Sequence, residues 1–217
     1  MPLNIDKRIF SFSRYLFFEI ISVKFRTSST KKLMDFLYAI FEKVATKFDI
    51  ISSNYLNMYQ ELVDKELEMV GISQNDHVII IGCGSLPITA ILVATKTNAQ
   101  VTAIDNDNFA VKEANKYIRK HHLEDKVKIE QADGESYPLK RFDIVYLSYG
   151  MKNKENIFKI ITNNTKKNSR IIFRTVIGSQ QENKKHTNEL SKWFFVKDSI
   201  KSKTLPPAGS YLLLRKQ

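Results

Sequence analysis

The sequence predicts an α/β fold, a doubly wound and mostly parallel sheet of seven strands preceded by helices. Two observations predict it. Residues 78–81 form a short apolar, β-branched run, which is typical of a strand buried on both faces of a parallel sheet. Downstream, similar runs alternate with segments of helical periodicity to the end of the chain. This alternation is the pattern of strand–helix–strand units.

Two amphipathic segments precede the sheet. Apolar residues recur at spacings of three and four in residues 31–47 and again in 53–70, which predicts two helices. Gly71 follows the second segment and is a natural C-cap. We therefore expect an N-terminal helical annex or lid in residues 1–71 and a ligand-binding sheet domain in residues 72–217.

The strands and helices of the sheet domain follow from the apolar runs between turn signals. Strands are expected at 78–81, 101–104, 127–130, 142–147, 170–175, 193–197 and 210–215. Helices are expected at 88–95, 109–121, 155–163 and 183–192. The last two strands are expected to form an antiparallel, hairpin-like edge of the sheet.

Composition narrows the class of protein. The chain has 217 residues, 43% of them apolar, which suits one globular domain with a helical annex. A single cysteine, Cys83, rules out an internal disulfide and leads us to expect a cytoplasmic protein. The longest uncharged run, 78–95, contains two glycines and a proline, so strand and helix are expected there rather than a membrane span.

The charge and the N-terminal aromatic residues bear on partners. The net charge of +11 comes mostly from scattered lysines, which indicates solvated faces more than a nucleic-acid surface, although a basic chain is compatible with nucleic acid. Residues 9–25 are rich in aromatic residues but are interrupted by charges, so a core or dimer contact is expected there, with a surface-lying or partner-facing helix as the alternative. A homodimer is therefore allowed, and a small-molecule acceptor is favoured over nucleic acid.

A glycine turn follows the first predicted strand. Gly82 and Gly84 come directly after the strand, Pro87 opens the next helix, and Asp105 ends the second strand 21 residues beyond Gly84. Strand, glycine turn, helix, strand and acid make up a nucleotide-binding βαβ unit, in which the acid accepts hydrogen bonds from ribose. Pro87 takes the place of the third glycine of the dinucleotide fingerprint. This favours a ligand with an adenosine but no diphosphate.

Several stretches resemble the Rossmann-fold methyltransferases, which use S-adenosylmethionine (SAM) as a co-substrate. They are IIIGCG, AIDND, the EQAD at 130–133, FDIVYLS at 142–148 and RIIFRT at 170–175. The glycine loop IGCGSLPITAIL, with its Gly-x-Gly-x-x-Pro-x-Thr pattern, is more similar to that of nicotianamine synthase and its bacterial opine-metallophore relatives. RTVIG at 174–178 and the late LPPAGSYLLLRK also resemble that family, over residues 55–216 in all.

This closer resemblance implies a different transfer. Enzymes of the nicotianamine synthase family transfer the aminocarboxypropyl arm of SAM rather than its methyl group. One departure from ordinary methyltransferases points the same way. Ile80 lies two residues before the first glycine, where many methyltransferases carry an acid that holds the methionine end of SAM.

Ligands of such sheets bind outside the carboxyl ends of the strands, so the loops after the first four strands are expected to form the SAM site. Asp105 would bind the ribose, and Asp107 and Asp133 would lie by the adenine unless they are simply exposed turn acids. Cys83 is expected to fill a position that needs a small side chain. The residues expected to contact SAM are Gly82, Cys83, Gly84, Ser85, Pro87, Thr89, Asp105, Asn106, Asp107, Asp133, Gly134, Ser148 and Tyr149.

The resemblance also implies a tyrosine and a glutamate that serve the proton transfer. Tyr59, in a segment similar to the family's Tyr-x-Glu-Leu, is the candidate tyrosine, or else a core aromatic residue. Glu42 is the candidate glutamate, or else an exposed helix position. Arg174 would bind a carboxylate of SAM or of the acceptor, or else form a structural salt bridge.

Three functions are compatible with these observations. The first is aminocarboxypropyl transfer from SAM to an amine on a small molecule, with no metal needed for catalysis. The second is methyl transfer to a small molecule or to RNA, although Leu147-Ser148-Tyr149-Gly150 lacks the Asn/Asp-Pro-Pro-aromatic motif of base-amino methyltransferases. The third is a non-catalytic SAM or nucleotide binder.

Overall fold

The computed structural model describes residues 49–148, 154–176, 180–203 and 208–216. The chain divides into two compact units, residues 1–55 and 56–217, and the sheet lies in the second. Two predicted site residues, Glu42 and Tyr149, lie outside the described residues, as does the predicted helix at 31–47. The helical annex and its boundary at residue 71 therefore stay predictions.

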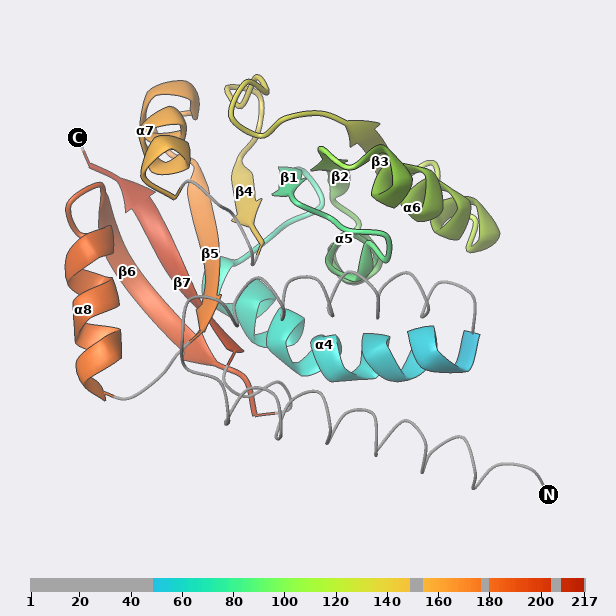
Figure 1. Ribbon diagram of the computed structural model, residues 1–217, viewed down its shortest axis with the longest axis horizontal. Coiled ribbons are helices and arrows are strands. Elements are labelled where there is room, and N and C mark those ends of the chain that lie inside the picture. The colour runs from blue at the N-terminus through green and yellow to red at the C-terminus, as the bar shows by residue number, and fades with distance from the viewer. Residues whose placement is uncertain (1–48, 149–153, 177–179, 204–207, 217) are drawn as a thin grey trace. The chain divides into compact units, whose positions relative to one another are not determined.

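Seven strands form one sheet in the order β3-β2-β1-β4-β5-β7-β6 (Figure 1). The strands are β1 His77–Ile81, β2 Gln100–Asp105, β3 Val127–Gln131, β4 Ile144–Leu147, β5 Arg170–Val176, β6 Phe194–Lys201 and β7 Ala208–Arg215. β1 to β5 pair in parallel, whereas β7 is antiparallel to both of its neighbours. The order turns back between β1 and β4, which is the switch point where such sheets bind ligands. This confirms the predicted doubly wound, mostly parallel sheet.

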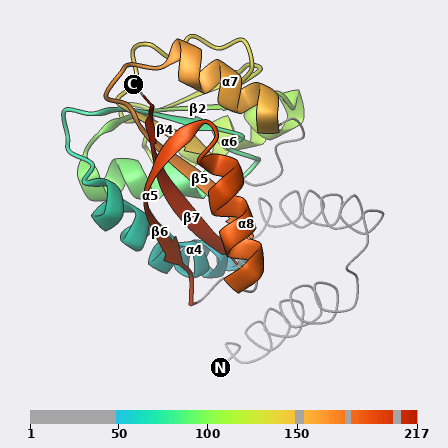
Figure 2. The same cartoon turned by 90° about the vertical axis from the view of Figure 1, so that its left-hand side faces the viewer.

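Helices cover both faces of the sheet (Figures 1 and 2). They are α4 Asp49–Val70, α5 Ile88–Thr97, α6 Asn108–Lys120, α7 Lys154–Asn164 and α8 Gln180–Leu190. Alternation along β1 divides its side chains between the two faces. Ile79 and Ile81 join a buried core with residues of α7 and α8, and the other face of the sheet carries α4, α5 and α6.

The element boundaries depart from the sequence prediction mainly at the sheet edge. β6 runs to Lys201 instead of residue 197, because it pairs with β7 as far as the Lys201–Gly209 register, across a bulge between Val196 and Asp198. β4 starts only at Ile144, because the Phe142 N–H donates to the Leu139 carbonyl in a turn. Inter-strand pairing, which local sequence does not reveal, sets the end of β6, whereas a local turn sets the start of β4.

A polar contact joins the amino ends of β1 and β4. The Asp143 carboxylate accepts a hydrogen bond from the His77 backbone N–H at 2.9 Å and pairs with the Lys166 ammonium. Burial acts to raise the pKa of the Asp143 carboxyl, but the His77 N–H and Lys166 outweigh it and hold the pKa below its ordinary value. The charged carboxylate therefore stabilises the fold.

We predict that Asp143→Asn lowers the free energy of unfolding by about 0.5–1 kcal/mol at pH 7. The loss should fade on acidification, because a depressed folded-state pKa stabilises above the ordinary carboxyl range and ceases to do so below the folded-state pKa. Urea unfolding at a series of pH values from 7 to 3 measures this. Asp125→Asn, at an exposed acid, is the control, and a loss at Asp143 that is independent of pH would contradict the assignment.

Candidate functional site

The glycine loop bends from the end of β1 over the end of β2. The backbone N–H groups of Gly82 and Cys83 both donate to the Ile104 carbonyl, at 2.9 and 3.1 Å. Gly82 and Gly84 have φ values of +81° and +66°, in the left-handed region that residues with a Cβ rarely adopt. The loop therefore requires glycine at both positions, and its backbone lies at the carboxyl end of the sheet as predicted for a ligand loop.

Asp105 braces this loop from the end of β2. Its Oδ2 accepts a hydrogen bond from the Gly84 N–H at 2.9 Å, and its Oδ1 accepts one from the Asp107 N–H at 3.0 Å. The residue is half-buried. Each carboxylate oxygen has a second lone pair, so the side chain can hold the loop and still accept a ribose hydroxyl.

The loop after β2 continues into α6 through a helix cap. Asn106 and Asp107 are exposed, and the Asp107 Oδ1 accepts the Phe109 N–H at 2.8 Å as the N-cap of α6. Asp107 is therefore an exposed acid in a turn, which was the alternative to an adenine contact. Contact of either side chain with adenine stays a prediction.

The loop after β3 carries Asp133 and Gly134. Asp133 is exposed, and its Oδ1 accepts the Glu135 N–H at 2.9 Å. Gly134 is buried, and a Cβ there would lie 2.4 Å from Cγ2 of Ile81. Glycine is thus required at 134 by close packing of this loop on β1, in addition to the predicted ligand contact.

Other predicted SAM contacts lie around the start of α5 and the end of β4. Pro87 is the N-cap of α5 rather than its first residue, and its side chain is buried, as is that of Ser85. Cys83 is half-buried. The half-buried Ser148 donates its N–H to the Ile81 carbonyl at 3.2 Å, and a Cβ on Gly82 would lie 3.5 Å from its Cβ. Ser148 thus lies against the glycine loop, and its contact with SAM stays a prediction.

A buried ion pair lies under the carboxyl end of the sheet, on the face that carries α4. Arg174 of β5 donates from Nε and Nη2 to the two carboxylate oxygens of Glu66 of α4, at 2.8 and 2.6 Å. Nη1 donates to the Thr89 hydroxyl of α5 at 2.6 Å, and the Ser210 hydroxyl of β7 donates to Glu66. None of these four residues, which we call the Glu66–Arg174 cluster, is more than 9% exposed.

Two tyrosine rings lie beside the guanidinium of this cluster. Its central carbon is 5.8 Å from the ring centroid of Tyr59 and 5.5 Å from that of Tyr146, within the range of cation–π contacts. Burial raises the pKa of the Tyr146 hydroxyl well above its ordinary value, with Glu66 adding to the shift and Arg174 opposing it. Tyr146 therefore stays protonated, and its hydroxyl has no hydrogen-bond partner in the described part of the chain.

The structure brings Tyr59, Thr89 and Arg174 together, and it adds three residues that sequence reasoning missed. These are Glu66, Tyr146 and Ser210. Arg174 has the buried salt bridge that was the alternative to carboxylate binding. One signal for Glu66 was present in the sequence, because it is an acid on the otherwise apolar stripe of α4 that contains Leu62 and Val70.

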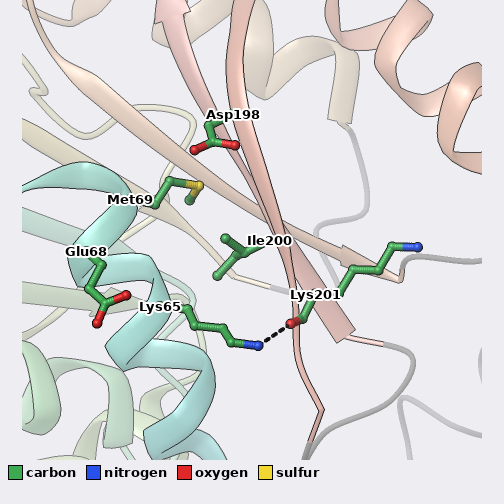
Figure 3. A pocket seen from close by; sticks show the side chains of 6 residues that line it. All are labelled: Lys65, Glu68, Met69, Asp198, Ile200 and Lys201. Carbon is green, nitrogen blue, oxygen red and sulfur yellow. Dashed lines mark hydrogen bonds between the residues drawn. The ribbon is translucent and has the colours of Figure 1, made fainter.

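The structure also contains a depression of about 430 Å³ away from the glycine loop (Figure 3). It lies between α4 and β6, and Lys65 donates across it to the Lys201 carbonyl at 2.9 Å. Its lining residues are Lys65, Glu68, Met69, Asp198, Ile200 and Lys201. Among the described residues, none from the loops that follow β1 to β4 lines this depression, so we do not assign the ligand to it.

The described residues form neither a metal-binding group nor a membrane-spanning helix. Within them, no group of three or more His, Cys, Asp or Glu side chains is arranged to hold a metal ion. That catalysis needs no metal stays a prediction. None of the helices described by the structure has the length and apolar character that crossing a membrane requires.

The chain is similar in sequence to known transferases. Residues 72–206, more than half of the chain, match a family model described as a methyltransferase domain. A 76-residue stretch is 28% identical to the L-histidine 2-aminobutanoyltransferase of Yersinia pestis. That match covers 35% of this chain and only 29% of the relative.

Solved structures share the fold at low identity. A mutant of MtNAS, a nicotianamine synthase, in complex with S-adenosylmethionine superposes with a TM-score of 0.66 and 18% identity, over 81% of this chain and 70% of that chain. An RNA methyltransferase from Salinibacter ruber in complex with S-adenosyl-L-homocysteine superposes with a TM-score of 0.57 and 16% identity, over 71% of this chain and 91% of that chain. At these identities the likeness is one of fold.

We predict that Asp105→Asn weakens SAM binding by about 1.5–3 kcal/mol, because the amide keeps only one acceptor oxygen for the Gly84 N–H, the Asp107 N–H and the ribose, and loses the negative charge that strengthens these hydrogen bonds. Isothermal titration of SAM into both proteins measures the change. Asp125→Asn serves as the exposed control and should bind as the wild type does. Unchanged affinity in a folded Asp105→Asn protein would overturn the role of Asp105.

Proposed function

The chain belongs to the family of methyltransferase domains and is a SAM-dependent transferase, and from this premise we propose that it transfers the aminocarboxypropyl arm of SAM to an amine. The acceptor is a small molecule. The products are an N-aminocarboxypropyl amine and methylthioadenosine.

The Glu66–Arg174 cluster is the observation that carries this proposal. Thr89 belongs to the Gly-x-Gly-x-x-Pro-x-Thr loop, Arg174 to RTVIG and Ser210 to LPPAGSYLLLRK. These three stretches set the resemblance to nicotianamine synthase apart from that to ordinary methyltransferases, and they are far apart in sequence. Their side chains meet in one buried cluster against α4, which also carries Tyr59. A shared structural reason for all three stretches supports a shared activity.

The environment of Ile80 supports the same choice. Ile80 is buried, and its register partners are Ala103 of β2 and Tyr146 of β4. Where many methyltransferases place an acid for the methionine amine, this chain therefore has an apolar side chain beside a protonated tyrosine. A methionine arm that is not fixed at this point is free to present the carbon next to sulfur to a nucleophile.

The reaction is an in-line displacement. The amine nitrogen forms a bond to the methionine Cγ of SAM, which is the carbon that joins the aminocarboxypropyl arm to the sulfonium. The bond between this carbon and sulfur breaks, and its electron pair stays on the sulfur of the leaving methylthioadenosine. The amine loses a proton, which a protein group accepts. Tyr59, on the face of α4 that packs on the sheet, is our candidate to orient the amine, and Glu42 is our candidate for the base.

The relatives suggest the class of acceptor. The Yersinia pestis relative is named for transfer of an aminobutanoyl group to L-histidine, and MtNAS is a nicotianamine synthase. Both names suit an acceptor with an amino or imidazole nitrogen. An amino acid or a molecule made from one is therefore the acceptor class that we propose.

Methyl transfer is the second candidate function. It is favoured by the description of the matching family model and by the fold shared with an RNA methyltransferase. The net charge of +11 is compatible with an RNA substrate. A homodimer and a cytoplasmic location stay predictions as well.

The product decides between the two transfers. We expect SAM incubated with the protein and a panel of amino acids, histidine included, to yield methylthioadenosine together with a modified acceptor, as measured by liquid chromatography and mass spectrometry. Parallel incubations with RNA test the second candidate. S-adenosylhomocysteine as the sole nucleoside product would contradict aminocarboxypropyl transfer and leave methyl transfer in its place.

Tyr59→Phe tests the catalytic tyrosine. If its hydroxyl takes part in proton transfer, turnover should fall by roughly 10²–10⁴-fold while SAM affinity stays nearly constant. Tyr117→Phe is a matched control, because Tyr117 of α6 is also 8% exposed but stacks on His121, outside the site. Equal turnover in the Tyr59 and Tyr117 variants would remove Tyr59 from the mechanism.

A further inference from the structure

Two arginines of β5 attach α4 to the sheet, one at each end of the strand. At the amino end, Arg170 pairs with Asp76 and donates to the carbonyls of Val70 and Gly71, at 3.0 and 2.7 Å. At the carboxyl end, Arg174 pairs with Glu66. The Arg170 side chain is 27% exposed, whereas that of Arg174 is 3% exposed. The second attachment is the one that lies near the glycine loop.

Arg174 contacts Glu66, Thr89 and Tyr59 at the same time. Its fork engages both carboxylate oxygens of Glu66, and Nη1 engages Thr89, the second residue of the helix that follows the glycine loop. The guanidinium also lies beside the ring of Tyr59, within cation–π range. Tyr59 and Glu66 are seven residues apart on α4, about two helical turns, so they lie on the same side of the helix.

Stability alone does not call for this arrangement. Two charges that are removed from water cost free energy that their mutual attraction repays only with good geometry, and apolar residues of similar volume often serve a fold equally well. What a planar, five-donor fork supplies is fixed relative orientation of the groups around it. Here those groups are Tyr59 and the start of α5.

On the basis of the proposed function, we propose that Arg174, held by Glu66, is the positioning residue of the site. It fixes the Tyr59 ring relative to α5, the helix that follows the glycine loop. Thr89 acts in this role as the hydrogen-bond acceptor of Arg174, so the threonine of the Pro-x-Thr pattern serves SAM indirectly. Tyr59 thereby approaches the reacting carbon in one orientation.

The test compares Arg174→Lys with Arg170→Lys, the same change on the same strand. Lysine keeps the charge but loses the fork and the second contact. The first readout is the ¹⁹F resonance of 3-fluorotyrosine incorporated in place of Tyr59. We expect Arg174→Lys to shift or broaden it and Arg170→Lys to leave it unchanged. An unchanged resonance in Arg174→Lys, or an equal change in both variants, would overturn the proposal.

The second readout is the division between turnover and binding. Because small displacements of a catalytic group slow reactions by up to about 100-fold, we expect kcat to fall 10- to 100-fold in Arg174→Lys with the SAM Kd within threefold. Tyr59→Phe should then cost less in the Arg174→Lys background than in the wild type, since coupled residues are not additive. A loss confined to SAM affinity, or fully additive effects, would contradict a positioning role.

Thr89 provides a variant that leaves the ion pair in place. Thr89→Val removes the acceptor of Arg174 and should alter the Tyr59 resonance as Arg174→Lys does, and Thr89→Ser should restore it. Thr89→Val therefore keeps the proposal testable even if Arg174→Lys does not fold. The resonance requires no turnover, so an inactive wild type would sink the proposed function without deciding the positioning role.

Discussion

The arrangement of the site depends on the buried ion pair between Glu66 and Arg174. Both side chains are almost completely withdrawn from water, so each would be costly without the other. The two hydrogen bonds from the Arg174 guanidinium to the Glu66 carboxylate join β5 to α4. The hydroxyls of Thr89 and Ser210 join the same pair to α5 and β7. The pair thus fixes the distance from the helix that carries Tyr59 to the sheet end where the glycine loop lies.

The glycine loop depends on a second, independent set of contacts. Ile104 and Asp105, the last two residues of β2, accept the N–H groups of Gly82, Cys83 and Gly84, so the parallel pairing of β1 and β2 shapes the loop. A loop that is shaped by the sheet and a helix that is held by an ion pair together frame the switch point between β1 and β4. In the transfer that we propose, the loop would hold SAM and the helix would present the acceptor.

The sequence was informative wherever a local pattern determines structure. Apolar runs between turn signals predicted all seven strands, and for the central parallel strands such as β1 and β4 the reason is that burial on both faces selects apolar, β-branched runs. The paired glycines predicted the turn that follows β1. It was less informative where structure depends on partners far along the chain. The extension of β6, the roles of Glu66 and Ser210, and the choice between salt bridge and ligand for Arg174 all depend on residues more than a hundred positions away or on sheet pairing.

If Glu66 and Arg174 act as one unit, a double-mutant cycle of unfolding free energies should show strong coupling between them. Denaturant unfolding of Glu66→Met, Arg174→Met and the double variant supplies the four corners with the wild type. Each single variant should lose about 3–5 kcal/mol, because it leaves one buried charge without its partner. We expect the double variant to lose less than either single variant. Losses that simply add would contradict it.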